Sequence, residues 1–346
     1  MKKILFIGLA AATMLAGCSN DETIEVSDTS RAIAFNDVFV DKSTRATDIT
    51  TENIEDFAVY GFIENTSACV FDKEKVYKEK DNWTYDNTQY WLPEKKYFFT
   101  AIAPFDGNWT YTPTDINAGT LTFNCSDASG DKDLVWAQAL GDNDEGIQYG
   151  TNGKIESQPD AVAFTFKHLL SRVKFTFENG FTNDANNLQV SSVNVNYALK
   201  HATIDLSNTS SELVWKKGAT DGQFTMNFGQ ASPQSGSYIA INSTGVTKHK
   251  YMIPENNKNI AVNFTVALYM NESLQETYSH TLTIEQFNME MGHSYNFIVE
   301  LTPENITPGG LFPIEFTVEE VEEWDENWED KEVSVPDNPT EPETGV

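Results

Sequence analysis

The clearest structural signal in the chain is the stretch IAVNFTVAL at residues 260–268. Every second residue of this stretch is large and apolar: Ile260, Val262, Phe264, Val266 and Leu268. A period of two predicts a β-strand with one buried face, because successive side chains of a strand point to opposite sides of a sheet.

The same alternation recurs in three other stretches of the second half, at residues 173–178, 295–301 and 312–318. We therefore expect antiparallel strands that bury one face and expose the other to water. Pro313 falls out of phase with the apolar residues of the last stretch, so this stretch suits an edge strand.

Shorter apolar runs divide the first half in a similar way. Clusters of Asp, Asn, Gly and Pro separate them at the spacing of a β-sandwich. The expected strands lie at residues 32–40, 57–63, 90–92, 97–103, 121–123 and 134–137. Helical periodicity is not sustained anywhere, so the sequence predicts an all-β fold of antiparallel β-sandwiches.

The segment at residues 141–158 is rich in Gly, Asp, Asn and Ser and contains no apolar run, which predicts a boundary between two domains in tandem. The expected organisation is a signal peptide at 1–17, a lipidated tether and leader strand at 18–45, sandwiches at 46–157 and 158–325, and a disordered acidic tail at 326–346.

Charge excludes one class of partner. The 346 residues include 23 Lys and Arg against 52 Asp and Glu, a formal net charge of −29 at pH 7. This excess of carboxylates repels phosphate, and no cluster of basic residues interrupts it, so we expect no binding to nucleic acid.

The N-terminus has the features of a bacterial lipoprotein leader. MKK precedes a short apolar stretch at residues 4–15, which is well below the roughly 20 residues that span a bilayer. LAGC at residues 15–18 is typical of a lipobox, which predicts that Cys18 becomes the lipidated first residue. The acidic run at residues 19–22 resembles an export signal to the outer face of the outer membrane, so the expected location is the cell surface; the alternative is chance acidity in a strongly acidic chain.

No metal-ligand, nucleophile, phosphate-loop or dinucleotide motif occurs, so we expect no catalytic residue, no metal ion and no cofactor. The DNDEG sequence at residues 142–146 lacks the distal Glu of a calcium loop and is expected to be a solvated turn. His168 is expected to be a hydrogen-bonded structural residue. Cys69 and Cys125 have no CxxC spacing and are compatible with one disulfide or with two separate thiols.

The tryptophans allow two interpretations. As flat apolar rings they could stack on sugars, which would make the protein a surface glycan-binding lipoprotein; as large aromatics they could fill the sandwich cores. The residues concerned are Trp83, Trp91, Trp109, Trp136 and Trp215. The core interpretation is favoured, because strand alternation assigns several of them to a buried face.

Several pieces of the chain resemble, in the same order, the fimbrillin (major-fimbria-like) family of type V pili. They are YW at 90–91, YFFTA at 97–101, DLVWA at 133–137, FKHLLSRV at 166–173 and GHSYNF at 292–297. The resemblance implies two transthyretin-like or Greek-key β-sandwiches and a lipoprotein exported to the surface. It also implies a structural, non-enzymatic role in an adhesive fimbria, with other fimbrial subunits as partners and a host or bacterial surface receptor.

Family members are trimmed by a trypsin-like protease after an arginine near the N-terminus. Two Arg-Ala bonds fit, Arg31-Ala32 and Arg45-Ala46. Only a cut between Arg45 and Ala46 also frees residues 32–40 and so leaves an unpaired ladder of backbone groups for a strand from another subunit. That bond is the predicted processing site; the alternative is that both arginines are ordinary linker residues.

A donor strand is predicted near the C-terminus. Phe312, Ile314, Phe316 and Val318 alternate and lie close to the chain end, as a strand supplied to a neighbouring subunit would. The alternative is that this strand completes its own second domain.

We expect Cys18→Ala to abolish membrane anchoring and surface display, because the loss of one thiol removes every acyl chain and the acidic protein has no other affinity for an anionic membrane. Metabolic labelling with a fatty acid checks this. A variant that retained the label would contradict the lipobox assignment.

Overall fold

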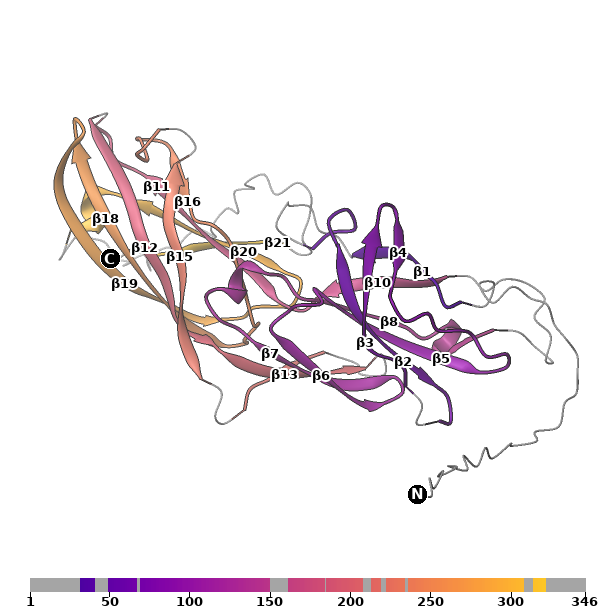
Figure 1. The fold of residues 1–346 in the computed structure, drawn as a ribbon. Coiled ribbons are helices and arrows are strands. Elements are labelled where there is room, and N and C mark those ends of the chain that lie inside the picture. Colours follow the sequence, from indigo (N-terminus) through magenta and orange to yellow (C-terminus); the bar gives the residue numbers. More distant parts are fainter. Residues whose placement is uncertain are drawn as a thin grey trace, which may run out of the picture.

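The structure is a computed structural model made almost wholly of β-strands (Figure 1). It describes residues 32–40, 49–66, 69–149, 161–183, 185–207, 213–218, 222–233, 236–307 and 314–321. Within these ranges the strands form three sheets, and no helix is long and apolar enough to cross a membrane. The α-helix α1 (Pro303–Ile306) has only four residues. The prediction of an all-β fold is confirmed.

The first sheet has eight strands and comes from the first half of the chain. Its order is β1 (Phe35–Val40), β10 (Val162–His168), β8 (Val135–Ala139), β5 (Lys96–Ala103), β2 (Asp56–Ile63), β3 (Cys69–Glu79) and β4 (Asn82–Thr84), with β9 (Ile147–Gln148) paired to β5. β1 runs parallel to β10, and the other pairs are antiparallel. β1 also contacts β4, so the sheet is curled and its two ends meet (Figure 1).

Strands β2 and β5 are apolar on both faces, and the sheet therefore borders two cores. Phe57 and Val59 point into a first core, which the curled sheet encloses. Ala58 and Tyr60, on the opposite face of β2, belong to a second core. All four side chains are buried, which accounts for the continuous apolar run that sequence alternation alone does not explain.

A four-stranded sheet covers the outer face of the first sheet. Its order is β14 (Trp215–Lys216), β13 (His201–Ser207), β7 (Ala118–Asn124) and β6 (Trp109–Asp115). β7 belongs to the first half and β13 to the second, and seven consecutive residue pairs join them. The second core is consequently continuous across the two halves.

The second sheet has nine strands, all from the second half. Its order is β19 (Ser273–Phe287), β18 (Lys258–Met270), β12 (Asn186–Leu199), β15 (Gln223–Pro233), β16 (Thr244–Val246), β11 (Ser171–Asn179), β20 (Ser294–Leu301) and β21 (Thr317–Val321), with β17 (Lys250–Met252) paired to β11. The strand predicted at residues 260–268 lies within β18, where Ile260, Val262, Phe264 and Val266 are buried as expected and Leu268 is half-buried. The 15-residue strand β19 forms one edge of this sheet.

The prediction that residues 173–178 expose a polar face to water holds for Glu178 but is wrong for Lys174 and Thr176. Lys174 and Thr176 are only 8% and 5% exposed. β11 lies inside the sheet and runs parallel to β20, so polar side chains of the two strands meet. Thr176 Oγ1 donates a hydrogen bond to Asn296 Oδ1 at 2.8 Å, and Arg172 Nε donates to Ser294 Oγ at 2.9 Å. These bonds satisfy polar groups that burial would otherwise leave unpaired.

The sheet topology divides the chain differently from the predicted boundary at residues 157/158. β10 follows that boundary, yet it pairs with β1 and β8 in the first sheet. The chain enters the second sheet only at Ser171, where β11 begins. The turn at Asp142–Asp144 connects β8 to β9, both of which pair with β5, so it lies within the first sheet.

Phe35 of β1 lies at the centre of the first core. The centroids of five other aromatic rings lie 5.6–6.3 Å from that of Phe35, and these rings belong to Phe57, Phe71, Tyr85, Phe99 and Phe164. Phe39, four residues further along the same strand, is 53% exposed. The strand therefore carries one phenylalanine in the core and one on the surface.

We expect Phe35→Ala to lower the free energy of unfolding by about 3–5 kcal/mol, because it opens a cavity among five rings. Phe39→Ala on the same strand is the matched control and should change it by no more than about 0.5 kcal/mol. Urea unfolding of the untrimmed protein measures both. Equal effects would show that β1 does not pack as described.

Candidate functional site

The predicted site residues belong to two segments, one near each end of the chain. Cys18, Arg31, Arg45, Ala46 and Phe312 lie outside the described residues. The structure does describe the remaining members of the set: Ala32, Ile314, Phe316 and Val318. The geometry of the site therefore rests on residues 32–40 and 314–321.

The N-terminal segment is an edge strand of the first sheet. β1 has one ladder neighbour, β10, and the preceding residues are tied to the segment before β5. Ile33 N donates to Gln89 O at 2.8 Å, and Tyr85 Oη donates to Ile33 O at 2.6 Å. Ala32 forms an isolated bridge with Tyr90, so the strand predicted at residues 90–92 is reduced to one bridge.

A bulge at Asp37 turns four apolar side chains of this segment toward the same core. Ile33 and Phe35 are in phase with each other, and the positive φ of 46° at Asp37 shifts the phase so that Val38 and Val40 follow them. All four side chains are at most 7% exposed. The Asn-Asp pair at residues 36–37 was the signal for this bulge, and simple alternation missed it.

Removal of residues 32–40 would open a groove along β10. The groove would be bounded by the free backbone edge of β10 and by the buried side chains of Val162, Phe164 and Phe166. Unpaired backbone groups beside exposed aromatic rings form a receptive edge for another strand.

A buried pair at the end of β10 holds the backbone at Ile49. His168 Nδ1 lies 2.8 Å from Asp133 Oδ2, and both side chains are buried. The same carboxylate oxygen accepts a hydrogen bond from Ile49 N at 3.2 Å. His168 is therefore a structural residue at the end of β10, as predicted, and it acts through Asp133 on the start of residues 49–66.

The C-terminal segment packs on its own second sheet in this structure. Ile314 is buried, and the ring of Phe316 lies 5.7 Å from that of Phe175 and 6.4 Å from that of Phe297. Strand pairing with β20 begins at Thr317, later than the strand predicted at residues 312–318. The expected alternation is present, because Glu315 and Thr317 are exposed.

The two segments have the same design. Each contributes an edge strand to its sheet, and each places a phenylalanine, Phe35 or Phe316, among several aromatic rings. They lie in different halves of the molecule (Figure 1). A site of this kind can bind a strand by backbone hydrogen bonds and apolar side chains.

The two cysteines do not form a disulfide in this structure. Cys69 is exposed and Cys125 is buried, and both are free thiols. Burial raises the pKa of the Cys125 thiol to about 12, so it stays protonated at neutral pH. Among the described residues, no group of three or more His, Cys, Asp or Glu side chains could hold a metal ion.

The core interpretation of the tryptophans is confirmed for three of the five. Trp91, Trp109 and Trp136 are at most 5% exposed. Trp83 and Trp215 are half-buried.

Comparisons with known proteins agree with this architecture. A family model described as fimbrillin-like matches residues 44–319. "Fimbrium subunit Fim1C" of Phocaeicola vulgatus is 31% identical over 195 residues, which are 49% of this chain and 50% of that protein. The chain thus matches about half the length of this relative.

A solved structure shares the fold. A fimbrial protein from Bacteroides vulgatus ATCC 8482 superposes with a TM-score of 0.56 at 16% identity, over 85% of this chain and 99% of that one. The matched residues include all three sheets except β1 and the last two residues of β21. The chain belongs to the fimbrillin-like family.

Proposed function

We propose that the protein is a structural subunit of a surface fimbria, anchored through a lipid on Cys18 and assembled by exchange of β-strands. Membership of the fimbrillin-like family and the similarity to a fimbrium subunit support the fimbrial role. The observation that carries the assembly mechanism is β1, an edge strand whose Phe35 fills the first core.

Cleavage between Arg45 and Ala46 would activate the subunit. It would release four buried apolar side chains of residues 32–40, each contributing about 1.5–3 kcal/mol, or about 6–12 kcal/mol together as an upper bound. That loss is comparable with the total stability of a typical domain. The trimmed subunit therefore has a strong tendency to bind a replacement strand.

The donor in this proposal is the segment with Phe312, Ile314, Phe316 and Val318 of another subunit. In its own subunit the described part of this segment packs on aromatic rings of the second sheet, so its transfer replaces one set of apolar contacts with another. The net drive for transfer then comes from the empty groove that proteolysis creates. An untrimmed subunit has no such groove and should stay monomeric.

The subunit is displayed at the outer membrane surface, its partners are other fimbrial subunits, and the filament serves adhesion. The alternative, a surface glycan-binding lipoprotein, would bind sugar as a monomer and form no filament.

We expect Arg45→Ala to abolish filament ladders in mild detergent, because the leader strand then keeps its groove occupied. Arg31→Ala is the matched control and should polymerise normally, since a cut after Arg45 remains available. Electrophoresis of the surface protein and N-terminal sequencing measure both effects. Ladders from the Arg45→Ala variant, or a mature protein that does not begin at Ala46, would contradict the processing step.

A disulfide that holds β21 against β20 of its own subunit should block elongation of the filament. Ile298 and Thr317 face each other across β20 and β21, and neither side chain is buried, so Ile298→Cys with Thr317→Cys suits a cross-strand bridge in a Cys69→Ser background. We expect the oxidised protein to stay monomeric after trimming and to polymerise once reduced.

The control for this lock is a bridge elsewhere in the same sheet. Thr265 and Ser279 pair across β18 and β19, which the proposed exchange does not use. The Thr265→Cys, Ser279→Cys protein should polymerise whether oxidised or reduced. If the locked β21 protein still forms ladders, the donor lies elsewhere in the chain.

A further inference from the structure

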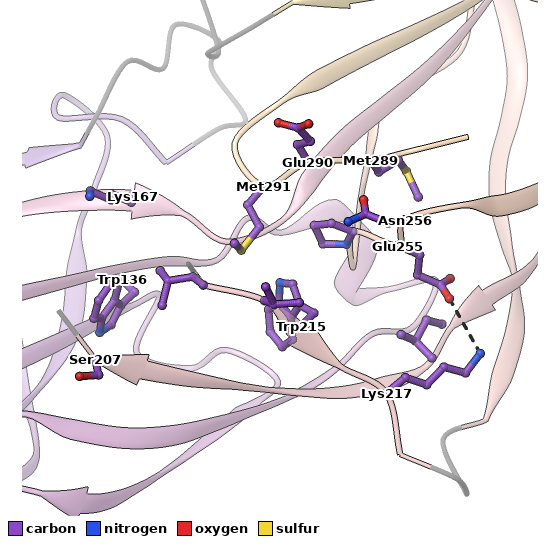
Figure 2. Close-up of a pocket in the computed structure, with 14 residues that line it drawn as sticks. Trp136, Lys167, Ser207, Trp215, Lys217, Glu255, Asn256, Met289, Glu290 and Met291 are labelled. Carbon is purple, nitrogen blue, oxygen red and sulfur yellow. Dashed lines mark ion pairs between the residues drawn. The ribbon is translucent and has the colours of Figure 1, made fainter. Parts of the chain in front are cut away.

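A cavity of about 720 Å³ lies where the two halves of the molecule meet (Figure 2). Its walls come from β8, β10 and the four-stranded sheet on one side, and from the connections β17–β18 and β19–β20 on the other. This volume falls within the range of small-molecule sites in proteins. Neither β1 nor β21 contributes to the lining, so the cavity is separate from the proposed assembly segments.

Trp215 provides a fixed aromatic surface in the cavity. Its Nε1 donates a hydrogen bond to Leu169 O at 2.7 Å, and its ring lies 6.2 Å from that of Phe123. The ring is half-buried and stands in the middle of the lining residues in Figure 2. A ring held in this way loses little conformational entropy when a ligand stacks on it.

The polar groups around Trp215 carry charges that cancel. Among the lining side chains, Lys167 and Lys217 contribute two positive charges, and Glu255 and Glu290 contribute two negative charges. Lys258, which does not line the cavity, also pairs with Glu255 at 3.2 Å. Lys217 Nζ lies 3.9 Å from Glu255 Oε2, the ion pair drawn in Figure 2. A balanced set of this kind favours an uncharged ligand over an anion or a cation.

The same rim can form hydrogen bonds in both directions. The exposed amide of Asn256 offers two donor hydrogens and one acceptor oxygen, the carboxylate of Glu255 accepts, and the ammonium of Lys217 donates. A purely apolar ligand would displace the water that is hydrogen-bonded to these groups and would offer no hydrogen bond in its place, which costs free energy. The rim therefore suits a ligand that carries hydroxyl groups.

The inner wall is apolar apart from one buried donor. Met289 is buried and Met291 is half-buried, and both flexible side chains can adapt to a ligand surface. The Trp136 ring also lines the cavity, and its Nε1 has no hydrogen-bond partner among the described residues. An oxygen of a ligand or of a water molecule that entered beside it would satisfy this donor.

We propose that this cavity binds a short neutral saccharide, stacked on Trp215 and hydrogen-bonded by Asn256, Glu255 and Lys217. A saccharide combines an apolar ring face with a rim of uncharged hydroxyl groups, which matches a fixed indole beside a charge-balanced polar rim. The site would add ligand binding to a subunit whose proposed role is structural.

The test is titration calorimetry on the chain from residue 19 onward, which contains every described residue. The probes are maltotriose, cellotriose and triacetylchitotriose as neutral trisaccharides, sialyllactose as an anionic one, and anilinonaphthalene sulfonate as an apolar dye. We expect one neutral trisaccharide to bind with one site per chain. Trp215→Ala should weaken its binding by at least about tenfold, and Asn256→Leu by about threefold to tenfold.

Trp83→Ala is the matched control. Trp83 is also half-buried and also packs on a phenylalanine, Phe57, with ring centroids 4.9 Å apart, but it does not line the cavity. It should bind the trisaccharide like the unchanged chain. Thermal melts identify any variant that fails to fold. If Trp215→Ala fails to fold, Asn256→Leu still tests the site, because the Asn256 side chain is exposed.

Three results would overturn the proposal. These are no binding of any neutral trisaccharide, binding of the anionic sugar or the dye alone, and neutral-sugar binding that Asn256→Leu and a folded Trp215 variant leave unchanged. Filament ladders are measured on the same variants. If the protein forms ladders but binds no sugar, the saccharide proposal is wrong and the assembly proposal stands. If it binds sugar but forms no ladders, the assembly proposal is wrong and the saccharide proposal stands.

Discussion

Strands β2 and β5 carry apolar side chains on both faces, and each face must be covered. The curling of the first sheet covers one face and brings β1 into the first core. The four-stranded sheet covers the other and brings β13 across from the second half. The need to cover both faces of β2 and β5 thus explains the position of β1, which we propose is removed, and that of β13, which joins the two halves.

β1 and the four-stranded sheet contribute to different cores, so removal of β1 disrupts only the first core. Every buried residue of β1 belongs to the first core, whereas the second core extends from Tyr60 into the second sheet without using β1. A trimmed subunit would therefore keep its larger core and the connection between its halves. Such a subunit can remain folded while it presents an open groove.

Regular alternation made β18 predictable from sequence, and short apolar runs bounded by turn residues did the same for β2 and β5. Where polar residues are buried by pairing with one another, as at Thr176 and Asn296, the pattern predicted solvent exposure and failed. β3 was missed because its charged residues and the positive φ at Lys73 interrupt its alternation. The motifs at Cys18 and Arg45 could be identified from local sequence alone, whereas the cavity around Trp215 could not, because distant segments of the chain build it.

The long edge strand β19 has a consequence for contacts between copies of the chain. Its ladder partner is β18, and its outer edge carries exposed carboxylates at Glu276 and Glu285. Two copies that paired along this edge would bring carboxylates of neighbouring strands together in a molecule that carries a net charge of −29, and like charges on paired strands are destabilising. Pairing of two copies along β19 is therefore disfavoured, whereas the proposed exchange through β1 and β21 does not use this edge.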